Sequence, residues 1–196
     1  MSKDRPRNLA ASVRHRLMEL ARKQGEDFQL VLTRYVIERL LYRLSQSEHG
    51  KKFVLNGAML FRLWADQPHR PTRDLDLLGK GEPSLEGLTK VFREVCRLAV
   101  EDDGLVFDPD SVTTERIKED QEYEGVRVSC RSYLGQARTD LQIDVGFGDA
   151  VVPRPAGVTY PAMLEFPAPA LLAYPGRRWS RRSIRRWWRW VSPTAA

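Results

Sequence analysis

Residues 71–78 read PTRDLDLL, and they place Asp74 and Asp76 one residue apart among leucines. In a strand alternate side chains share a face, so the two aspartates point to one side while the leucines point to the other. Two neighbouring carboxylates repel each other unless a cation lies between them. Mg²⁺ prefers hard oxygen ligands and commonly binds through one or two carboxylates together with substrate phosphates. The stretch therefore predicts a strand that presents a divalent-metal site.

The residues before this strand add a second element of phosphate chemistry. Residues 53–55 predict a short apolar strand, and Gly57 begins a helical stretch that runs to about residue 65. A loop with two prolines then leads into the strand of residues 73–79. A glycine that opens a helix lets a triphosphate approach backbone N–H groups, and the helix N-terminus favours the negative charge.

A third carboxylate is expected on a later strand. Residues 124–134 alternate between apolar and polar side chains, and a hairpin turn around Gly135 leads into residues 138–149. There Asp140, Gln142 and Asp144 alternate with three apolar residues, which places Asp144 on a polar strand face. A carboxylate on a neighbouring strand could complete a two-metal site and help activate an attacking hydroxyl.

The remaining periodic segments predict the fold class. Helices over residues 8–23 and 26–45 form an N-terminal pair, and an amphipathic helix covers residues 84–101. The proline-rich segment after Val151 predicts a connection that wraps the domain edge. The expected fold is α/β, a small mixed sheet flanked by helices with the helical pair in front of it.

Composition excludes several classes of protein. The chain has 196 residues, 42% of them hydrophobic, and no apolar run approaches the roughly 20 residues that span a bilayer. The N-terminal residues lack the apolar centre of a secretory signal, so we expect a cytoplasmic protein with no membrane partner. Cys96 and Cys130 are far apart in sequence, which indicates core or surface thiols rather than a zinc site or disulfide framework.

The net charge of +6 is unevenly distributed. Seven arginines and four of the five tryptophans lie in residues 176–196, and this segment contains no acidic residue. Without these arginines the rest of the chain is close to neutral. The basic character therefore belongs to the tail and gives no reason to assign a polyanion-binding surface to the main domain.

The stretch FVLNGAMLFRLWADQPHRPTRDLDLLG resembles the AbiEii/AbiGii nucleotidyltransferase toxins, relatives of the DNA polymerase β-like nucleotidyltransferases. Their signature is a strand that ends in a Gly-Gly, Gly-Ser or Gly-Ala pair at the head of a helix, followed by R-x-T-x-D-x-D. The resemblance extends from about Asp27 to Tyr174. It implies a nucleotidyltransferase-like fold and Mg²⁺-dependent transfer of a nucleoside monophosphate from an NTP.

The resemblance also implies roles for individual residues. Asp74, Asp76 and Asp144 would bind Mg²⁺ and carry catalysis, with Asp144 chosen as the third acid over Asp140 and Asp149. The nucleotide-binding residues would be Gly57, Ala58, Arg70 and Thr72, of which the first two would cradle the phosphates. Arg70 has an equally good structural interpretation as the ion-pair partner of a nearby aspartate, and Thr72 as a hydroxyl that orders the turn. Asn56 departs from the family, whose members more often have lysine there.

The tail departs from the family more strongly. Members continue after a segment like LLAYP into a helical domain that supplies a lysine and an aspartate to the active site, whereas this chain continues GRRWSRRSIRRWWRWVSPTAA. Regrouping plausible codons by one base restores a family-like continuation, so we expect a frameshift after about residue 175. The alternative is a native tail that binds nucleic acid or a membrane surface. The expected organisation is helices over 1–50, a nucleotidyltransferase core over 51–175 and an aberrant tail over 176–196.

The resemblance implies a toxin of a toxin–antitoxin, or abortive infection, system. Its partners would be an NTP, a tRNA acceptor and a cognate antitoxin encoded nearby. Two alternatives remain open: an inactive, truncated remnant, and nucleotidyl transfer to a protein or small-molecule hydroxyl.

Overall fold

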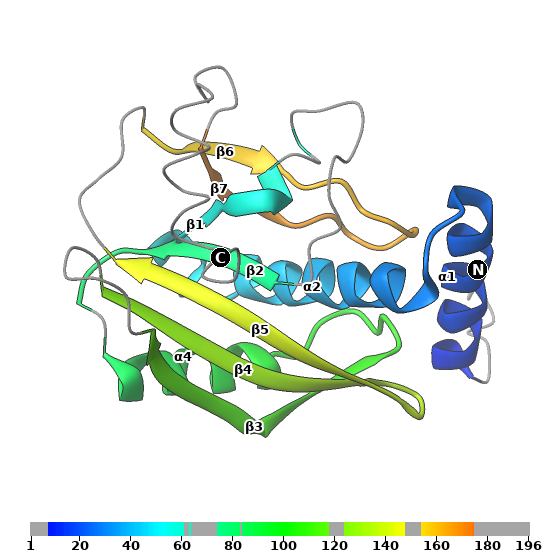
Figure 1. Cartoon of the computed structure of the whole chain (residues 1–196), viewed down its shortest axis with the longest axis horizontal. Helices are drawn as coiled ribbons and strands as arrows, with labels where there is room; N and C mark the ends of the chain where they lie inside the picture. The colour runs from blue at the N-terminus through cyan, green and yellow to red at the C-terminus, as the bar shows by residue number, and fades with distance from the viewer. Residues whose placement is uncertain are drawn as a thin grey trace, which may run out of the picture.

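The computed structural model describes residues 8–60, 63, 74–82, 84–117, 124–147 and 154–174. Within these ranges seven strands form one mixed sheet in the order β3-β4-β5-β2-β1-β7-β6, which confirms the α/β class (Figure 1). The strands are β1 (Phe53–Asn56), β2 (Asp74–Gly79), β3 (Leu105–Ile117), β4 (Glu124–Leu134), β5 (Ala137–Phe147), β6 (Ala156–Thr159) and β7 (Ala170–Ala173). The helices are α1 (Leu9–Gln24), α2 (Phe28–Gln46) and α4 (Leu85–Arg97), with short 3₁₀ helices η1 (Gly50–Lys52) and η2 (Gly57–Leu60).

The N-terminal helices begin and end at the residues that helix capping favours. The side chain of Asn8 accepts a hydrogen bond from the N–H of Ala11 at the start of α1, and Asp27 accepts one from Leu30 at the start of α2. Gly25 ends α1 in the left-handed conformation, with φ 65°, which glycine adopts without a side-chain clash. This turn lets α2 pass behind the sheet while α1 stands at its end (Figure 1).

The centre of the sheet is where parallel and antiparallel pairing meet. β2 pairs antiparallel with β1 and parallel with β5, and β4 pairs antiparallel with β5. Leu75 and Leu77 of β2 are buried, as are Ile143 and Val145 on β5, and all four belong to the main hydrophobic core. The opposite face of the same strands carries the aspartates, as alternation requires.

The structure differs from the sequence expectations at three places. The residues after Gly57 form the short η2, and most of the predicted helix to residue 65 lies outside the described residues. α4 ends at Arg97 rather than near residue 101 because Leu98 is already extended, with φ −61° and ψ 120°. The proline-rich segment contributes β6 and β7, and β7 pairs parallel with β1.

Two further findings concern the cysteines and the helices. Cys96 and Cys130 are free, buried thiols, as the sequence predicted for core cysteines. No helix among the described residues is both long enough and apolar enough to cross a bilayer.

Candidate functional site

The strand registers align five polar residues in one row across five neighbouring strands. Asn56 on β1 lies opposite Asp76 on β2, and Asp76 lies opposite Asp144 on β5. Asp144 in turn lies opposite Arg127 on β4, and Arg127 opposite Glu115 on the edge strand β3. Directly opposed residues point to the same sheet face. The row therefore joins two of the predicted acids to a basic residue.

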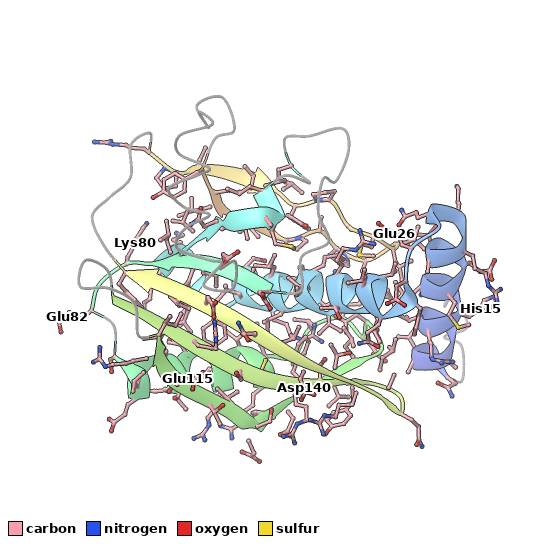
Figure 2. The ribbon with its side chains drawn as sticks, viewed as in Figure 1. His15, Glu26, Lys80, Glu82, Glu115 and Asp140 are labelled. Atoms are coloured by element: carbon pink, nitrogen blue, oxygen red, sulfur yellow. The ribbon has the colours of Figure 1, made fainter. Side chains whose placement is uncertain are left out.

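The row lies on the sheet face away from the helices. Thr114, the neighbour of Glu115, contacts α4 through the hydroxyl of Thr89, so Glu115 points to the opposite side. In Figure 1 α2 passes behind β2 while α4 lies behind β4 and β3, and Figure 2 labels Glu115 near β3. The polar row thus lies on the face that α2 and α4 leave uncovered.

Asp76 is the most unusual residue of this row. It is only 4% exposed, and no donor among the described residues reaches its Oδ1 atom. Burial, followed by the charges of Asp144 and Asp74, raises the pKa of Asp76 to about 7, while a hydrogen bond from the N–H of Ala58 lowers it. A buried carboxylate with an unpartnered oxygen is costly to the fold, which points to a ligand at this position.

Gly57 brings the η2 backbone against this carboxylate. Its φ of 73° lies in the left-handed region, where a side chain is strained. A Cβ atom at Gly57 would overlap Oδ2 of Asp76 and come within 2.7 Å of its Cγ. Glycine is therefore required here both for the turn and for the close approach of the loop to Asp76.

Gly57→Ala is expected to destabilise the protein by about 2–4 kcal/mol, since it combines backbone strain with a steric clash. It should also displace Asp76. Chemical denaturation measures the first effect. Gly25→Ala is the matched control because Gly25 has a similar φ of 65° but no atom within 4 Å of the position that a Cβ would take. Equal losses in the two variants would contradict the close-packing argument and leave only backbone strain.

Asp144 is held by a two-pronged ion pair. Arg127 donates from Nε to Oδ1 and from Nη2 to Oδ2 of Asp144, both at 2.9 Å. The Asp144 side chain is 13% exposed and that of Arg127 34%, so the pair is partly shielded from water. The hydrogen bond to Asp144 raises the pKa of Arg127, which therefore remains charged at any physiological pH.

The structure brings together some of the predicted site residues and leaves others untested. Asp74, Asp76 and Asp144 share one sheet face, and Gly57 and Ala58 contact Asp76. Arg70, Thr72 and Asp149 lie outside the described residues. Asp140, the other alternative for the third acid, lies on β5 nearer the hairpin and pairs with Arg138 at 2.9 Å (Figure 2).

The residues present fit a hard divalent cation. Three carboxylates lie on one face, and one of them is buried with an oxygen that lacks a protein donor among the described residues. Carboxylate oxygens are the ligands that Mg²⁺ prefers, and a cation would offset the repulsion that raises the pKa of Asp76. Asp76, Asp144 and Asp74 are therefore the residues that would hold it.

In this conformation, however, the three carboxylates are not gathered closely. Over the described part of the chain, the metal-ligating atoms that do lie within 4.8 Å of one another belong to Glu48, His49 and Glu94, beyond the other end of β1. His49 contacts Glu94 at 2.7 Å through Nε2 and Lys52 at 3.2 Å through Nδ1. Both ring nitrogens are thus engaged in an ion-pair network, and we assign this group a structural role.

Sequence reasoning missed Arg127. Because side chains alternate along residues 124–134, Arg127 points to the other sheet face from the buried Val126 and Val128. Its place on the polar face could therefore have been predicted. The pairing of Arg127 with Asp144 depends on the β4–β5 register, which follows from the tight turn at Gly135. Pairing the residues of the two strands one by one outward from that turn places Arg127 opposite Asp144.

The comparisons with known proteins give one family over most of the chain. A sequence profile of the family described as nucleotidyl transferase AbiEii toxin, type IV TA system, matches residues 39–178. Among solved structures, an inferred nucleotidyltransferase from H. pylori is 15% identical with a TM-score of 0.46, covering 82% of this chain and 58% of that one. JHP933 from Helicobacter pylori is 16% identical with a TM-score of 0.40, covering 65% and 47%. The chain thus spans about half the length of these proteins. No curated protein matches it significantly.

Proposed function

We propose, given that this chain belongs to the nucleotidyl transferase AbiEii toxin family, that it transfers a nucleoside monophosphate from an NTP to an acceptor hydroxyl. Mg²⁺ is the cofactor in this proposal, and Asp74, Asp76 and Asp144 hold it. The acceptor is tRNA, and the partner that neutralises the toxin is a cognate antitoxin. The cellular location is the cytoplasm, where NTPs and tRNA are found.

The observation that carries the proposal is the state of Asp76. A carboxylate that is 4% exposed, beside two other carboxylates and with an unpartnered oxygen, is destabilising in the absence of a ligand. A core position with no function would more readily hold an asparagine or an apolar residue. A divalent cation that binds NTP phosphates supplies both the missing partner and a chemical reason for the arrangement.

The proposed reaction is an in-line displacement at the α-phosphorus of the NTP. The acceptor oxygen forms a bond to phosphorus, the bond to the bridging oxygen of the β-phosphate breaks, and pyrophosphate leaves. Asp144 takes the proton of the acceptor hydroxyl. The cation, when bound, neutralises charge on the phosphates. Gly57 keeps the η2 backbone against Asp76, which is where phosphates that share the cation would lie.

The direct test is incorporation of label from each α-³²P NTP into total tRNA by the full chain with Mg²⁺. We expect labelled tRNA, no label in EDTA, and unchanged labelling by Asp140→Asn, which removes an acid of the same strand that is paired with Arg138. Label in protein or in a small molecule would replace tRNA as the acceptor and keep the reaction. No transfer to any acceptor would overturn the proposal and favour an inactive remnant.

A further inference from the structure

Arg127 determines where the Asp144 carboxylate lies. The register places Arg127 and Asp76 on opposite sides of Asp144. The guanidinium binds one Asp144 oxygen through Nε and the other through Nη2, both at 2.9 Å. This planar fork fixes the carboxylate in orientation as well as in position. Asp144 is therefore drawn towards β4 and away from its other neighbour, Asp76.

That position conflicts with a shared cation. A cation held by all three aspartates requires an oxygen from each within ligand distance, yet one oxygen from each of the three does not lie within 4.8 Å of the others. Both Asp144 oxygens already accept from Arg127. Asp144 must consequently turn away from the fork before it can complete the site.

A second acceptor for Arg127 is already in place. Gln142 precedes Asp144 by two residues on β5 and lies on the same face. In the amide orientation that satisfies both groups, its side-chain oxygen accepts from Nε and Nη2 of Arg127, each at 3.0 Å. Glu115 on β3 lies opposite Arg127 and adds a further negative charge. The guanidinium can therefore release Asp144 and remain hydrogen-bonded.

We propose that Arg127 is a positioning residue that exchanges between Asp144 and Gln142, and that it competes with the divalent cation for Asp144. Without cation, the fork holds Asp144 and neutralises one of the three clustered carboxylates. With cation, Asp144 turns towards Asp76 while Gln142 keeps Arg127 in place. The inference rests on the proposed function, because it assumes the cation site of Asp74, Asp76 and Asp144.

The test is the dissociation constant of Mn²⁺ and of Mg²⁺ for the full chain, measured by calorimetry without nucleotide. Arg127→Leu removes the competitor and is expected to tighten binding by about two- to fivefold, the range for a partly exposed ion pair. Gln142→Leu removes the alternative acceptor and is expected to weaken binding by about threefold. Changes of opposite sign in the cation dissociation constants of the two variants would support the exchange. A merely structural role of both residues would weaken cation binding in both variants.

Two further variants separate the fork from simple charge. Arg138→Leu deletes a guanidinium on β5 that pairs with Asp140 and not with Asp144, and it should leave the dissociation constant of the cation unchanged. Arg127→Lys keeps the charge but loses the fork, so it should tighten binding nearly as much as Arg127→Leu. If Arg127→Lys binds the cation as weakly as the wild type does, the positive charge alone accounts for the competition, and the role of the two-pronged hydrogen bond is overturned.

The remaining outcomes distinguish failure of the inference from failure of the proposed function. Cation binding that Asp76→Asn abolishes, but that Arg127→Leu leaves unchanged or weakens, overturns the competition alone. Absence of binding in both the wild type and Arg127→Leu overturns the metal site and the inference with it. Thermal unfolding in EDTA shows that each variant is folded before its affinity is compared.

Discussion

Asp76→Asn is expected to reduce nucleotide transfer by about a thousandfold or more and, without metal, to make the protein more stable. Asparagine keeps the shape of the side chain but removes the charge that would bind the cation, and loss of a metal ligand costs several kcal/mol of transition-state stabilisation. The same change removes a buried carboxylate that is repelled by Asp144 and Asp74. The expected gain in unfolding free energy at pH 8 is about 1–3 kcal/mol.

The sign of this gain follows from the pKa of Asp76. Its pKa of about 7 in the folded protein is raised above the ordinary aspartate value of 3.8. The neutral acid is therefore compatible with the fold, and stability is lost as the pH rises through the folded pKa and the group ionises. In EDTA the wild type should lose on the order of 4 kcal/mol between pH 4 and pH 8 through this one group. Asp76→Asn should lack that component.

Urea denaturation of both proteins at pH 4 and at pH 8 in EDTA measures the effect, alongside transfer of labelled nucleotide. Asp140→Asn is the matched control, since that carboxylate is 63% exposed and paired with Arg138. It should change neither the activity nor the pH dependence appreciably. A variant that is less stable than the wild type at pH 8 would show that Asp76 contributes favourably to the fold without a cation, which contradicts the electrostatic argument.

The candidate site was largely predictable from local sequence because strand alternation has a fixed period. The DLD stretch identifies which residues share a face without any knowledge of their neighbours. Alternation does not reveal which strands pair with each other, since the parallel pairing of β2 with β5 joins residues nearly 70 positions apart. Alternation placed Asp144 on a polar strand face and the family resemblance selected it over Asp140 and Asp149, whereas Arg127 needed the register of the β4–β5 hairpin.

Two features of the fold were hidden for other physical reasons. The prolines around β6 and β7 indicate loops, yet they lie before and after these four-residue strands, and β6 is an edge strand with one side that needs no partner. The charged residues of α2 suggest a solvated face, but Glu38, Arg39 and Arg43 are all buried. A single sequence does not distinguish a charge that faces water from one whose partner lies 60 residues away.

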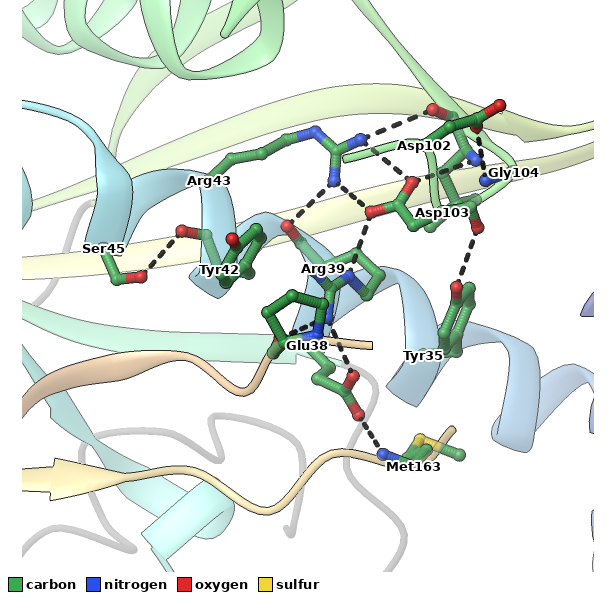
Figure 3. Close-up of polar contacts among 12 residues, drawn as sticks. Tyr35, Glu38, Arg39, Tyr42, Arg43, Ser45, Asp102, Asp103, Gly104 and Met163 are labelled. Atoms are coloured by element: carbon green, nitrogen blue, oxygen red, sulfur yellow. Dashed lines mark hydrogen bonds and ion pairs between the residues drawn. The ribbon is translucent and has the colours of Figure 1, made fainter. Parts of the chain in front are cut away.

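That partner is Asp103, which is fully buried between α2 and the start of β3 (Figure 3). Its Oδ2 accepts from Arg39 Nε at 3.0 Å and from Arg43 Nη1 at 2.6 Å, and its Oδ1 accepts from Arg43 Nη2 at 3.0 Å. Arg39 also donates to the carbonyl of Pro167, and Glu38 accepts from the N–H of Met163. The network ties α2 to the strands and to the segment that precedes β7.

Asp103→Leu is expected to destabilise the protein by about 3–5 kcal/mol, because it leaves two buried guanidiniums facing only one buried carboxylate. This is a large part of the roughly 5–15 kcal/mol that typically separates a folded domain from its unfolded chain. Urea denaturation measures the loss. Asp102→Ala is the neighbouring control: its exposed carboxylate accepts the N–H of Gly104, and we expect a change of about 0.5 kcal/mol.

The charge argument predicts that a second substitution compensates for the first. In the wild type, Arg39 and Arg43 are balanced by Glu38 and Asp103, all four of them buried. Asp103→Leu/Arg43→Met restores that balance, since Arg39 retains Glu38 and the Pro167 carbonyl. Replacing a buried ion pair by apolar residues of similar volume is often close to neutral. The double variant should therefore be more stable than Asp103→Leu alone. Additive losses would instead show that the hydrogen bonds, rather than the unbalanced charge, account for the stability that Asp103 supplies.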